Sequence, residues 1–307
     1  MAERISMLVC TRNRADALAT MLARLPVALL VREGAELVIV DNGSSDATPA
    51  VLAAFAAGPG APLAPVLVRE DRKGLSNARN AAIRAAHGTL FCFIDDDCYL
   101  GEGYFDVARR IFADPGVGYA GGRIIAHDPR GRGVGEMLHD TVHLQPPRSP
   151  VWLGMFQGAS FIVRRRVFET IGLFDPALGA GAPFRCEDIE FAARASFEGF
   201  AGRHDPDLIV YHDHGRHEPG AIEEITRENA LGSGSYYALC MLREARRGSL
   251  ATLRMWYREA REAGERRALR WQIRGALAFV AAAASGRLKP YRAGTRWNEK
   301  LPPLPGT

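Results

Sequence analysis

The sequence predicts an α/β protein with a mostly parallel central sheet, helices on both faces and a helical extension at the C-terminus. Two observations support this prediction. In the first hundred residues, short apolar runs alternate with segments of helical spacing, and this order implies parallel strands joined by right-handed crossovers. Polar residues follow directly after these apolar runs, and ligands of such sheets bind at the carboxyl ends of the strands.

Four strands and three helices are expected in this first part of the chain. The expected strands are "RISMLVC" (4–10), "AELVIVD" (35–41), "APVLVRE" (64–70) and "TLFCFIDDD" (89–97). The expected helices are "ADALATMLARL" (15–25), "SSDATPAVLAAFAA" (44–57) and "GLSNARNAAIRAAHG" (74–88). Ser and Asp at the start of the second helix are good caps, and Pro49 suits its first turn.

The remaining chain is less regular. Residues 101–157 are the less regular part, in which "GGRIIAHDPRGRGVGE" (121–136) and "QPPRSP" (145–150) are expected to be loops, and long loops on α/β folds often shape or cover a site. A strand and a helix are expected in "GASFIVRRRVFETIG" (158–172), a helix in "EDIEFAARASFEGF" (187–200) and a strand in "DLIVYHDHG" (207–215). The chain is then helical and rich in Arg to about residue 286. We therefore predict an α/β domain, residues 1–218, and a basic helical extension, residues 219–307.

The charge of the chain is unevenly divided. The net charge is +4, but residues 219–307 contain 16 Lys and Arg against 8 Asp and Glu, whereas residues 1–218 contain 23 against 27. Five scattered cysteines without CxxC spacing argue for reduced thiols and against a disulfide framework or a zinc site. Because the N-terminus also lacks a signal-peptide pattern, we expect a cytoplasmic protein.

The basic extension allows two interpretations. Its Arg clusters, Trp256, Trp271, Trp297 and the apolar stretch "GALAFVAAAASG" would suit peripheral contact with the inner face of a membrane. The alternative is an ordinary amphipathic helix packed against the α/β domain. The apolar stretch is too short to span a bilayer, and no nucleic acid is expected as a partner because no recognition motif is present.

Three consecutive carboxylates, Asp95, Asp96 and Asp97, stand at the end of the fourth expected strand. Adjacent like charges repel, and a bound cation would make the cluster favourable. On an extended strand, Asp95 and Asp97 share a face while Asp96 points away. Two carboxylates converging at a strand end suit Mg²⁺ or Mn²⁺ with open positions for phosphate oxygens, whereas a solvated turn is the simpler alternative.

Histidines provide further candidate ligands. "YHDHGRHE" contains His212, His214 and His217, and imidazole is a competent ligand for Mn²⁺; alternatively, these are surface residues of a connection. "HDTVH", with His139 and His143, has the spacing of a zinc-protease helix. It carries Asp where Glu is expected and lies among Gly and Pro, so a metalloprotease is not expected.

Two other segments carry candidate chemistry. "CEDIEF" places Glu187 and Asp188 at the start of a helix, as simple N-terminal capping or as a carboxylate that accepts a proton from a hydroxyl. "KGLSNARN" places Lys73 and Arg79 near another helix start, which suits anion binding, although an ordinary helix start with a solvated Arg is equally simple. The chain has neither GxGxxG after its first strand nor GxxxxGK[ST], which argues against dinucleotide oxidoreductases and P-loop NTPases.

Six motifs together resemble family 2 glycosyltransferases of the GT-A fold, whose central sheet is Rossmann-like. They are, in order, "VCTRNRADAL", "VIVDNGSSDAT", "GLSNARNAAI", "FIDDDC", "GASFIVRRRVFETIGLFDPALGAG" and "CEDIEFAARASFEGF". The resemblance covers roughly residues 5–215. It implies a catalytic domain with a nucleotide-sugar half, about residues 1–100, and an acceptor half, about residues 101–218.

The resemblance also implies roles for individual residues. Thr11, Asn13 and Arg14 would lie in the nucleotide pocket, Asp41 at the base, and Asp95 near the ribose and metal. The donor site is also expected to include Lys73 and Arg79, from the anion-binding helix start described above, and Asp96, which could share ligand duty with its neighbours. The metal would be Mn²⁺ or Mg²⁺, bound by Asp97, Asp95 and either His212 or His214. Asp188 would be the general base, and Glu187 would orient the acceptor or the base.

The implied reaction is an inverting single displacement from a nucleotide-sugar, with UDP as the favoured nucleotide, to a carbohydrate, lipid-linked or small-molecule acceptor. One alternative is a non-catalytic protein that binds nucleotide-sugars or glycans, which would be expected to lack the metal or base residues. Another is a sugar-nucleotide pyrophosphorylase, which would need a Gly-rich basic loop after the first strand; "TRNRADAL" contains no glycine.

Overall fold

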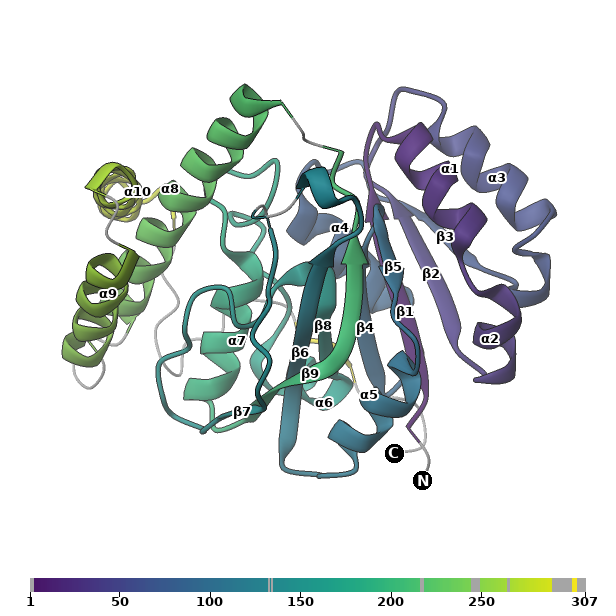
Figure 1. Ribbon diagram of the computed structural model, residues 1–307, viewed down its shortest axis with the longest axis horizontal. Coiled ribbons are helices and arrows are strands. Elements are labelled where there is room, and N and C mark those ends of the chain that lie inside the picture. Colours follow the sequence, from purple (N-terminus) through teal and green to yellow (C-terminus); the bar gives the residue numbers. More distant parts are fainter. Residues whose placement is uncertain are drawn as a thin grey trace.

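A computed structural model describes residues 3–131, 133, 135–215, 218–243, 249–263, 266–288 and 300–302. Within these residues, nine strands form one mixed sheet in the order β3-β2-β1-β4-β8-β6-β9-β5, with β7 paired to β9 (Figure 1). In Figure 1, α1, α2 and α3 lie at one end of the sheet and α8, α9 and α10 lie at the other. The predicted α/β class is confirmed.

The first four strands are parallel, as the alternation of strands and helices predicted. They are β1 (Ile5–Thr11), β2 (Glu36–Asp41), β3 (Val66–Arg69) and β4 (Leu90–Asp95). The connecting helices are α1 (Ala15–Arg24), α2 (Val27–Arg32), α3 (Thr48–Ala57), the short η1 (Ala61–Leu63) and α4 (Leu75–Ala85). Register pairs Thr11 with Asp41 and Cys10 with Asp95, so the polar ends of three strands meet at one edge.

The strands divide their side chains between two cores because successive residues point to opposite faces. Leu8 and Phe93 belong to the core covered by α4, α6 (Arg165–Ile171) and α7 (Glu187–Phe197). Val9 and Ile94 belong to the core covered by α1, α2, α3 and α5 (Tyr104–Phe112). Both faces of the sheet are therefore buried, which explains the nearly continuous apolar strands.

The second half of the sheet is mixed. Its strands are β5 (Cys98–Leu100), β6 (Val117–Ala126), β7 (His143–Gln145), β8 (Phe161–Arg164) and β9 (Ala201–His212). Strand β8 is antiparallel to β4 and β6, β9 is parallel to β6, and β5 is antiparallel to β9. Two short helices, η2 (Pro129–Gly131) and η3 (Gly158–Ser160), complete this part.

The expected loop over residues 121–136 was partly wrong, because strand β6 extends to Ala126, and helix α5 was not predicted. Helix α5 buries Tyr104, Phe105, Ala108 and Ile111, a helical spacing that a short glycine-flanked segment disguised. Strand β6 contains several glycines, and close packing explains them: a Cβ on Gly122 would lie 1.9 Å from the carbonyl oxygen of Leu208 on β9. Glycine therefore permits close strand contact here and does not mark a turn.

Three helices follow β9: α8 (Pro219–Arg243), α9 (Ser249–Ala263) and α10 (Arg266–Ala284). They share the core of the α/β part, since Tyr236, Met255 and Phe279 are buried in it, and the Tyr236 hydroxyl donates to the Val151 carbonyl at 2.7 Å. Within the described residues, no helix is both long and apolar enough to cross a membrane. His217 and Trp297 lie outside the described residues. The division of the chain at residue 218 stays a prediction.

Candidate active site

A cavity of about 550 Å³ lies at the carboxyl edge of the parallel strands. Segments from distant parts of the chain line it, among them the ends of β1 and β4, the start of α4, the turn at η3, the start of α7 and the end of β9. Of the residues predicted for the site, it is lined by Thr11, Arg14, Lys73, Arg79, Asp95, Asp96, Asp97, Glu187, Asp188, His212 and His214. The fold therefore gathers at one place residues that are up to about 200 positions apart in sequence.

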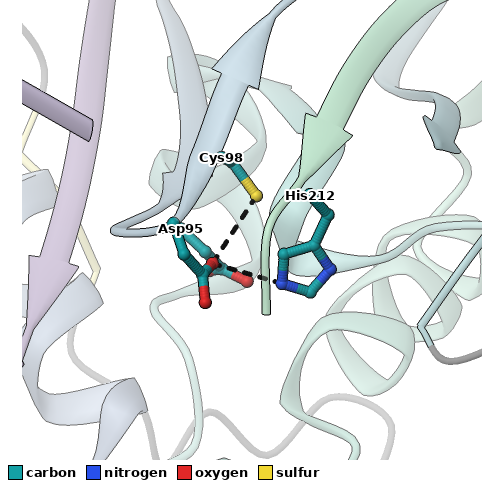
Figure 2. Close-up of side chains that lie close together, drawn as sticks. Asp95, Cys98 and His212 are labelled. Atoms are coloured by element: carbon teal, nitrogen blue, oxygen red, sulfur yellow. Dashed lines mark hydrogen bonds and ion pairs between the residues drawn. The ribbon is translucent and has the colours of Figure 1, made fainter. Parts of the chain in front are cut away.

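Asp95 and Asp97 converge with Cys98 and His212 at the end of β4. One potential ligand atom from each of these residues lies within 4.8 Å of the others, and Figure 2 shows three of the side chains directed toward one point. Strand pairing explains the meeting, because Cys98 of β5 is the register partner of His212 on β9. The His212 Nε2 atom lies 3.2 Å from Asp97 Oδ1.

Cys98 is the member of this cluster least suited to bind a hard cation. Its sulfur is a soft ligand, whereas Mn²⁺ and Mg²⁺ prefer harder ligands, and burial raises the pKa of the metal-free thiol well above the ordinary value. Two carboxylates and an imidazole remain, and oxygen with imidazole ligands suits Mn²⁺ or Mg²⁺. The donor set thus fits the divalent cation that the sequence predicted, with Asp95, Asp97 and His212 as its candidate ligands.

Asp96 points away from this cluster. Its carboxylate accepts hydrogen bonds from the Thr11 hydroxyl at 2.6 Å and from Arg14 Nε at 2.8 Å, while the Arg14 guanidinium also contacts Asp97. Burial raises the pKa of Asp96 to about 6, although Arg14 and the Thr11 hydrogen bond oppose this effect. Arg14 thereby offsets part of the repulsion among the three carboxylates.

Arg79 connects the acidic cluster to the start of α7. Its guanidinium donates to Glu187 Oε1 at 2.8 Å and lies 3.6 Å from Asp95 Oδ1, although only 3% of the residue is exposed. The aromatic rings of Phe93 and Phe174 pack beside it, with centroids 5.8 Å and 5.6 Å away. Burial, together with the neighbouring Asp188, raises the pKa of Glu187 to about 7. The pattern "NAR" predicted only that this Arg could bind an anion.

Asp188 is held at the cavity wall by backbone amides. Its Oδ2 atom accepts the Gly158 N–H at 2.8 Å, and its Oδ1 atom accepts the Ile189 N–H at 2.7 Å. The residue that caps α7, Cys186, has a φ of 95°, a conformation that favours glycine and strains other residues. This bend directs the first turn of α7, with its carboxylates, toward the cavity. A half-buried carboxylate in this setting can accept a proton from a bound hydroxyl.

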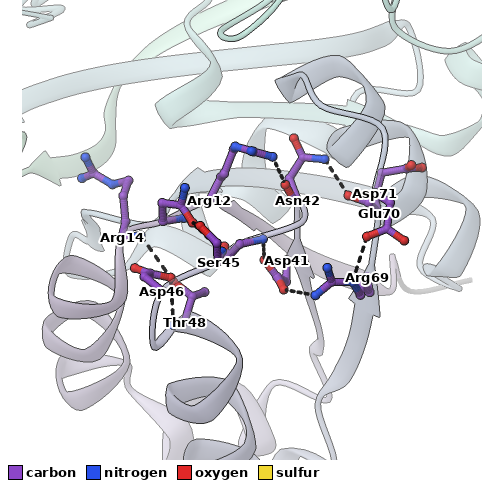
Figure 3. Close-up of polar contacts among 12 residues, drawn as sticks. Arg12, Arg14, Asp41, Asn42, Ser45, Asp46, Thr48, Arg69, Glu70 and Asp71 are labelled. Atoms are coloured by element: carbon purple, nitrogen blue, oxygen red, sulfur yellow. Dashed lines mark hydrogen bonds and ion pairs between the residues drawn. The ribbon is translucent and has the colours of Figure 1, made fainter.

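Hydrogen bonds join the loop after β1 to the loop after β2 (Figure 3). Asp41 accepts the Ser44 N–H at 2.8 Å and lies 3.3 Å from Arg69 Nη1, and Asn13 Oδ1 accepts the Ser45 N–H at 2.7 Å. Neither Asp41 nor Asn13 is among the residues that line the cavity. Their described contacts stabilise the loops that form its border.

Several lining residues were missed by the sequence analysis. Asn42 donates to the carbonyl oxygens of Glu70 and Arg72 at 2.8 Å each and accepts the Gly74 N–H at 2.9 Å, thereby fixing the loop before α4. Others include Cys10, Arg12, Gln157, Gly158, Arg185, Ile225 and Asn229. The position of Asn42 next to Asp41 could have indicated its role. Nothing in the local sequence marks Ile225 and Asn229, which lie on α8 in the C-terminal extension.

The two histidines at the end of β9 occupy different positions. His212 belongs to the cluster around Asp97, whereas His214 is buried and lines the cavity beyond it, with 5.6 Å between the two ring centroids. Strand pairing ends at His212, so the alternation that would place both rings on one face no longer applies.

Comparison with known proteins agrees with this geometry. The sequence matches the family described as "Glycosyl transferase family 2" over residues 6–172, more than half of the chain. Among curated proteins, it is similar to glycosyltransferase AglE of Haloferax volcanii, with 25% identity over 177 residues. That alignment covers 58% of this chain and 56% of the relative, so the chain spans little more than half of the relative's length.

Solved structures show the same fold at low identity. One is the mannosyltransferase PcManGT from Pyrobaculum calidifontis, in complex with GDP-Man and Mn²⁺, with a TM-score of 0.63, 21% identity, and coverage of 93% of this chain and 76% of that chain. Another is S. aureus TarS 1-349, with a TM-score of 0.56, 19% identity, and coverage of 92% and 82%. The predicted GT-A fold is confirmed, and with the family match over more than half of its length, the chain belongs to glycosyl transferase family 2.

Proposed function

We propose that this protein is an inverting, metal-dependent glycosyltransferase that moves a sugar from a nucleotide-sugar, with UDP as the first candidate nucleotide, to a hydroxyl of its acceptor. One observation carries the proposal: Asp95, Asp97 and His212, whose ligand atoms lie close enough together to hold a cation, line the same cavity as Asp188 at the start of α7. A carbohydrate transfer by single displacement needs these two functions on either side of the reacting carbon.

The donor side is formed by the first half of the chain. In this proposal, Thr11 and Arg14 border the nucleotide, Asp41 and Asn13 shape the loops at its base, and Lys73 faces the diphosphate. These loops are already ordered by mutual hydrogen bonds, so little conformational entropy would be lost on binding. The structures similar to this chain include PcManGT with GDP-Man and Mn²⁺ and TarS 1-349 with UDP-GlcNAc, which supports a nucleotide-sugar as the ligand.

The metal ligands in this proposal are Asp97, Asp95 and His212. A divalent cation bound there would spread the charge of the diphosphate leaving group. Arg14 and Arg79 contact the same carboxylates, so they balance the charge of the cluster and keep its side chains oriented. His214 lies beyond the cluster and is left out of the ligand set.

The chemistry assigned to this chain's own residues is a proton transfer. Asp188 accepts the proton of the acceptor hydroxyl as its oxygen attacks the anomeric carbon. The bond between that carbon and the diphosphate oxygen breaks, and the nucleoside diphosphate leaves with the electron pair. Attack from the opposite face inverts the anomeric centre, and Glu187, fixed by Arg79, positions Asp188 at the start of α7.

The acceptor side is assigned to Arg185, Ile225 and Asn229, which line the cavity from the segment before α7 and from α8. Arg185 is held by an ion pair with Glu228. Because α8 belongs to the helical extension, the extension would contribute to acceptor choice. Asn229 is polar and Ile225 is apolar, and both reach the cavity from α8, which suits a hydroxylated acceptor with an apolar part.

The first test is a thermal-shift titration with UDP, GDP and dTDP, each with and without Mn²⁺. A ligand that binds only the folded state adds about 2.7 kcal/mol at a hundredfold excess over its Kd, which is easily measured. We expect a shift with UDP that requires Mn²⁺. A rise in melting temperature with GDP alone would mean that the nucleotide is GDP and not UDP. No rise with any of the three nucleotides would contradict the proposed donor site.

The second test separates catalysis from binding. Asp188→Asn keeps the shape of the side chain but removes the base, so transfer should fall by about 10²–10⁴-fold while Mn²⁺-dependent nucleotide binding persists. Asp106→Asn on the outer face of α5 is the matched control, because its carboxylate is 86% exposed, and it should leave both unchanged. Full transfer by the Asp188 variant would exclude the assigned role.

A further inference from the structure

The outer faces of α9 and α10 expose large apolar side chains that nothing in the described structure covers. On α9 these are Leu250, Leu253 and Tyr257, and on α10 they are Ile273, Leu277 and Val280. Each set follows the spacing of one helix face, i, i+3 or i+4, and i+7. The exposed fractions of Leu250, Tyr257 and Leu277 are 69%, 69% and 65%, respectively. We call these six residues the α9–α10 surface.

The opposite faces of the same helices are firmly packed, which fixes the direction of the α9–α10 surface. Met255 and Phe279 are buried, and the Trp256 ring stacks on Tyr237 with centroids 5.1 Å apart. The Trp256 indole also donates to Gln272 of α10 at 2.7 Å. Packing against the body therefore explains one face of each helix and leaves the other unexplained.

Arginines border the apolar stripe along both helices. Arg254 and Arg261 lie beside the apolar residues of α9, and Arg270 and Arg274 lie beside those of α10. All four arginines are exposed. Helix α10 contains no acidic residue in its 19 positions. The whole extension, residues 219–307, has a net charge of +8 from 16 basic and 8 acidic residues. The exposed apolar stripe thus lies in a positively charged surrounding.

We propose that the α9–α10 surface docks on an anionic lipid bilayer, with its apolar side chains in the acyl boundary and its arginines at the phosphate headgroups. An apolar helix face bordered by Arg is the pattern of helices that lie in the membrane interface. A second copy of this chain fits less well, because a twofold contact through the same surface would bring the arginines of the two copies together. Charge complementarity therefore selects the lipid surface.

The position of the surface relative to the cavity is also fixed. Helix α8 lines the cavity near its N-terminal end through Ile225 and Asn229, and Tyr236 and Tyr237 of the same helix are buried in the core near α9. In Figure 1, α9 and α10 lie beside α8, on the side away from α1 and α3. Docking would thus keep the cavity at a fixed distance from the membrane surface.

The test is flotation of the full-length chain with two kinds of vesicle: phosphatidylcholine alone, and phosphatidylcholine with about one third phosphatidylglycerol. We expect the chain to float with the anionic vesicles and to dissociate as salt rises, because screening weakens contacts between exposed charges. This binding does not depend on the proposed transferase activity, and nucleotide binding measured separately distinguishes the failure of one from that of the other.

Two variants separate the apolar and the charged contributions. Leu253→Glu with Leu277→Glu should lower vesicle binding more than tenfold, because each side chain loses its transfer into the acyl boundary. Arg270→Gln with Arg274→Gln should lower binding to anionic vesicles about fivefold for each arginine and leave neutral vesicles unaffected. Val31→Glu, at a 45% exposed position on α2, is the matched control and should bind as the parent chain does.

Unchanged melting temperatures would establish that the exposed substitutions leave the fold intact. The proposal is overturned if the chain floats with neither vesicle, if it binds both equally and without salt dependence, or if the double Leu variant binds as well as Val31→Glu does. It is also overturned if light scattering shows a dimer that the double Leu variant converts to monomers, since the surface would then join two copies.

Discussion

Replacing Arg79 with methionine tests whether the link between the acidic cluster and α7 stabilises the fold. Methionine keeps most of the apolar stem between Phe93 and Phe174 but removes the guanidinium. Glu187, which is 7% exposed, then loses the donor 2.8 Å from its carboxylate, and Asp95 loses a cation 3.6 Å away. Breaking a buried ion pair on one side costs about 3–5 kcal/mol when the remaining group stays charged, so the measurement is made above the pKa of about 7 that burial gives Glu187.

Urea unfolding of metal-free protein measures this cost directly. A change of 1 kcal/mol shifts the Tm of a protein of this size by about 2–4 °C, so the Arg79→Met variant should melt on the order of 10 °C lower. Arg84→Met is the matched control in the same helix, because Arg84 is exposed, and it should change the free energy of unfolding by about 0.5 kcal/mol or less.

A double-mutant cycle identifies the partner. Glu187→Gln removes the charge that Arg79 neutralises, so the double variant should lose about 1–3 kcal/mol less than the two single variants together. A cost for Arg79→Met below about 1 kcal/mol, or strict additivity with Glu187→Gln, would refute the reasoning. The first result would mean that water or another group compensates Glu187, and the second that Arg79 acts through packing alone.

Three further predictions concern the same site. Asp97→Ala should weaken nucleotide binding in Mn²⁺ but not in EDTA, and equal Mn²⁺-dependent affinity by calorimetry would contradict the assigned ligand. Burial raises the pKa of Glu187 from 4.5 to about 7, so between these two pH values the folded metal-free protein keeps a proton that the unfolded chain releases. Its free energy of unfolding should fall as pH rises, by at most about 1.4 kcal/mol per pH unit, and Glu187→Gln should flatten this slope in urea titrations at about pH 5 and pH 7. Gly158→Ala would place a Cβ 2.0 Å from Arg79 Nη2, so it should destabilise the fold by about 1–3 kcal/mol. Gly220→Ala is the control, because a Cβ there meets open space. Equal melting temperatures of the two variants would exclude the clash.

Local sequence was sufficient wherever a feature depends on neighbouring residues. The period of apolar residues predicted β1 to β4 and the helices α1, α3 and α4 between them, and the order of these elements predicted their parallel pairing. Parallel pairing in turn placed Thr11, Asp41 and Asp95 at one edge of the sheet. The sequence alone also determined the family resemblance and the basic character of the extension.

Tertiary structure decided which of these residues face the same cavity. His212 joins Asp97 through antiparallel pairing of β5 with β9, whereas His214, two positions later, lies past the end of that strand. Asp41 lies at the edge that was predicted, yet its carboxylate is directed to Ser44 and Arg69, and it does not line the cavity. Side-chain direction at a strand end depends on the turn that follows, which the period of the strand does not specify.

Long-range contacts were the other part that the sequence left open. The glycines of β6 suggested a loop, because the strand that packs against Gly122 is more than 80 residues away. Ile225 and Asn229 of α8 reach the cavity only because Tyr236 and its neighbours join the core of the α/β part. The sequence thus determined the elements, their order and the charge of the extension. Only the packing of distant segments decided which side chains meet, because that depends on contacts whose two partners are never adjacent in the chain.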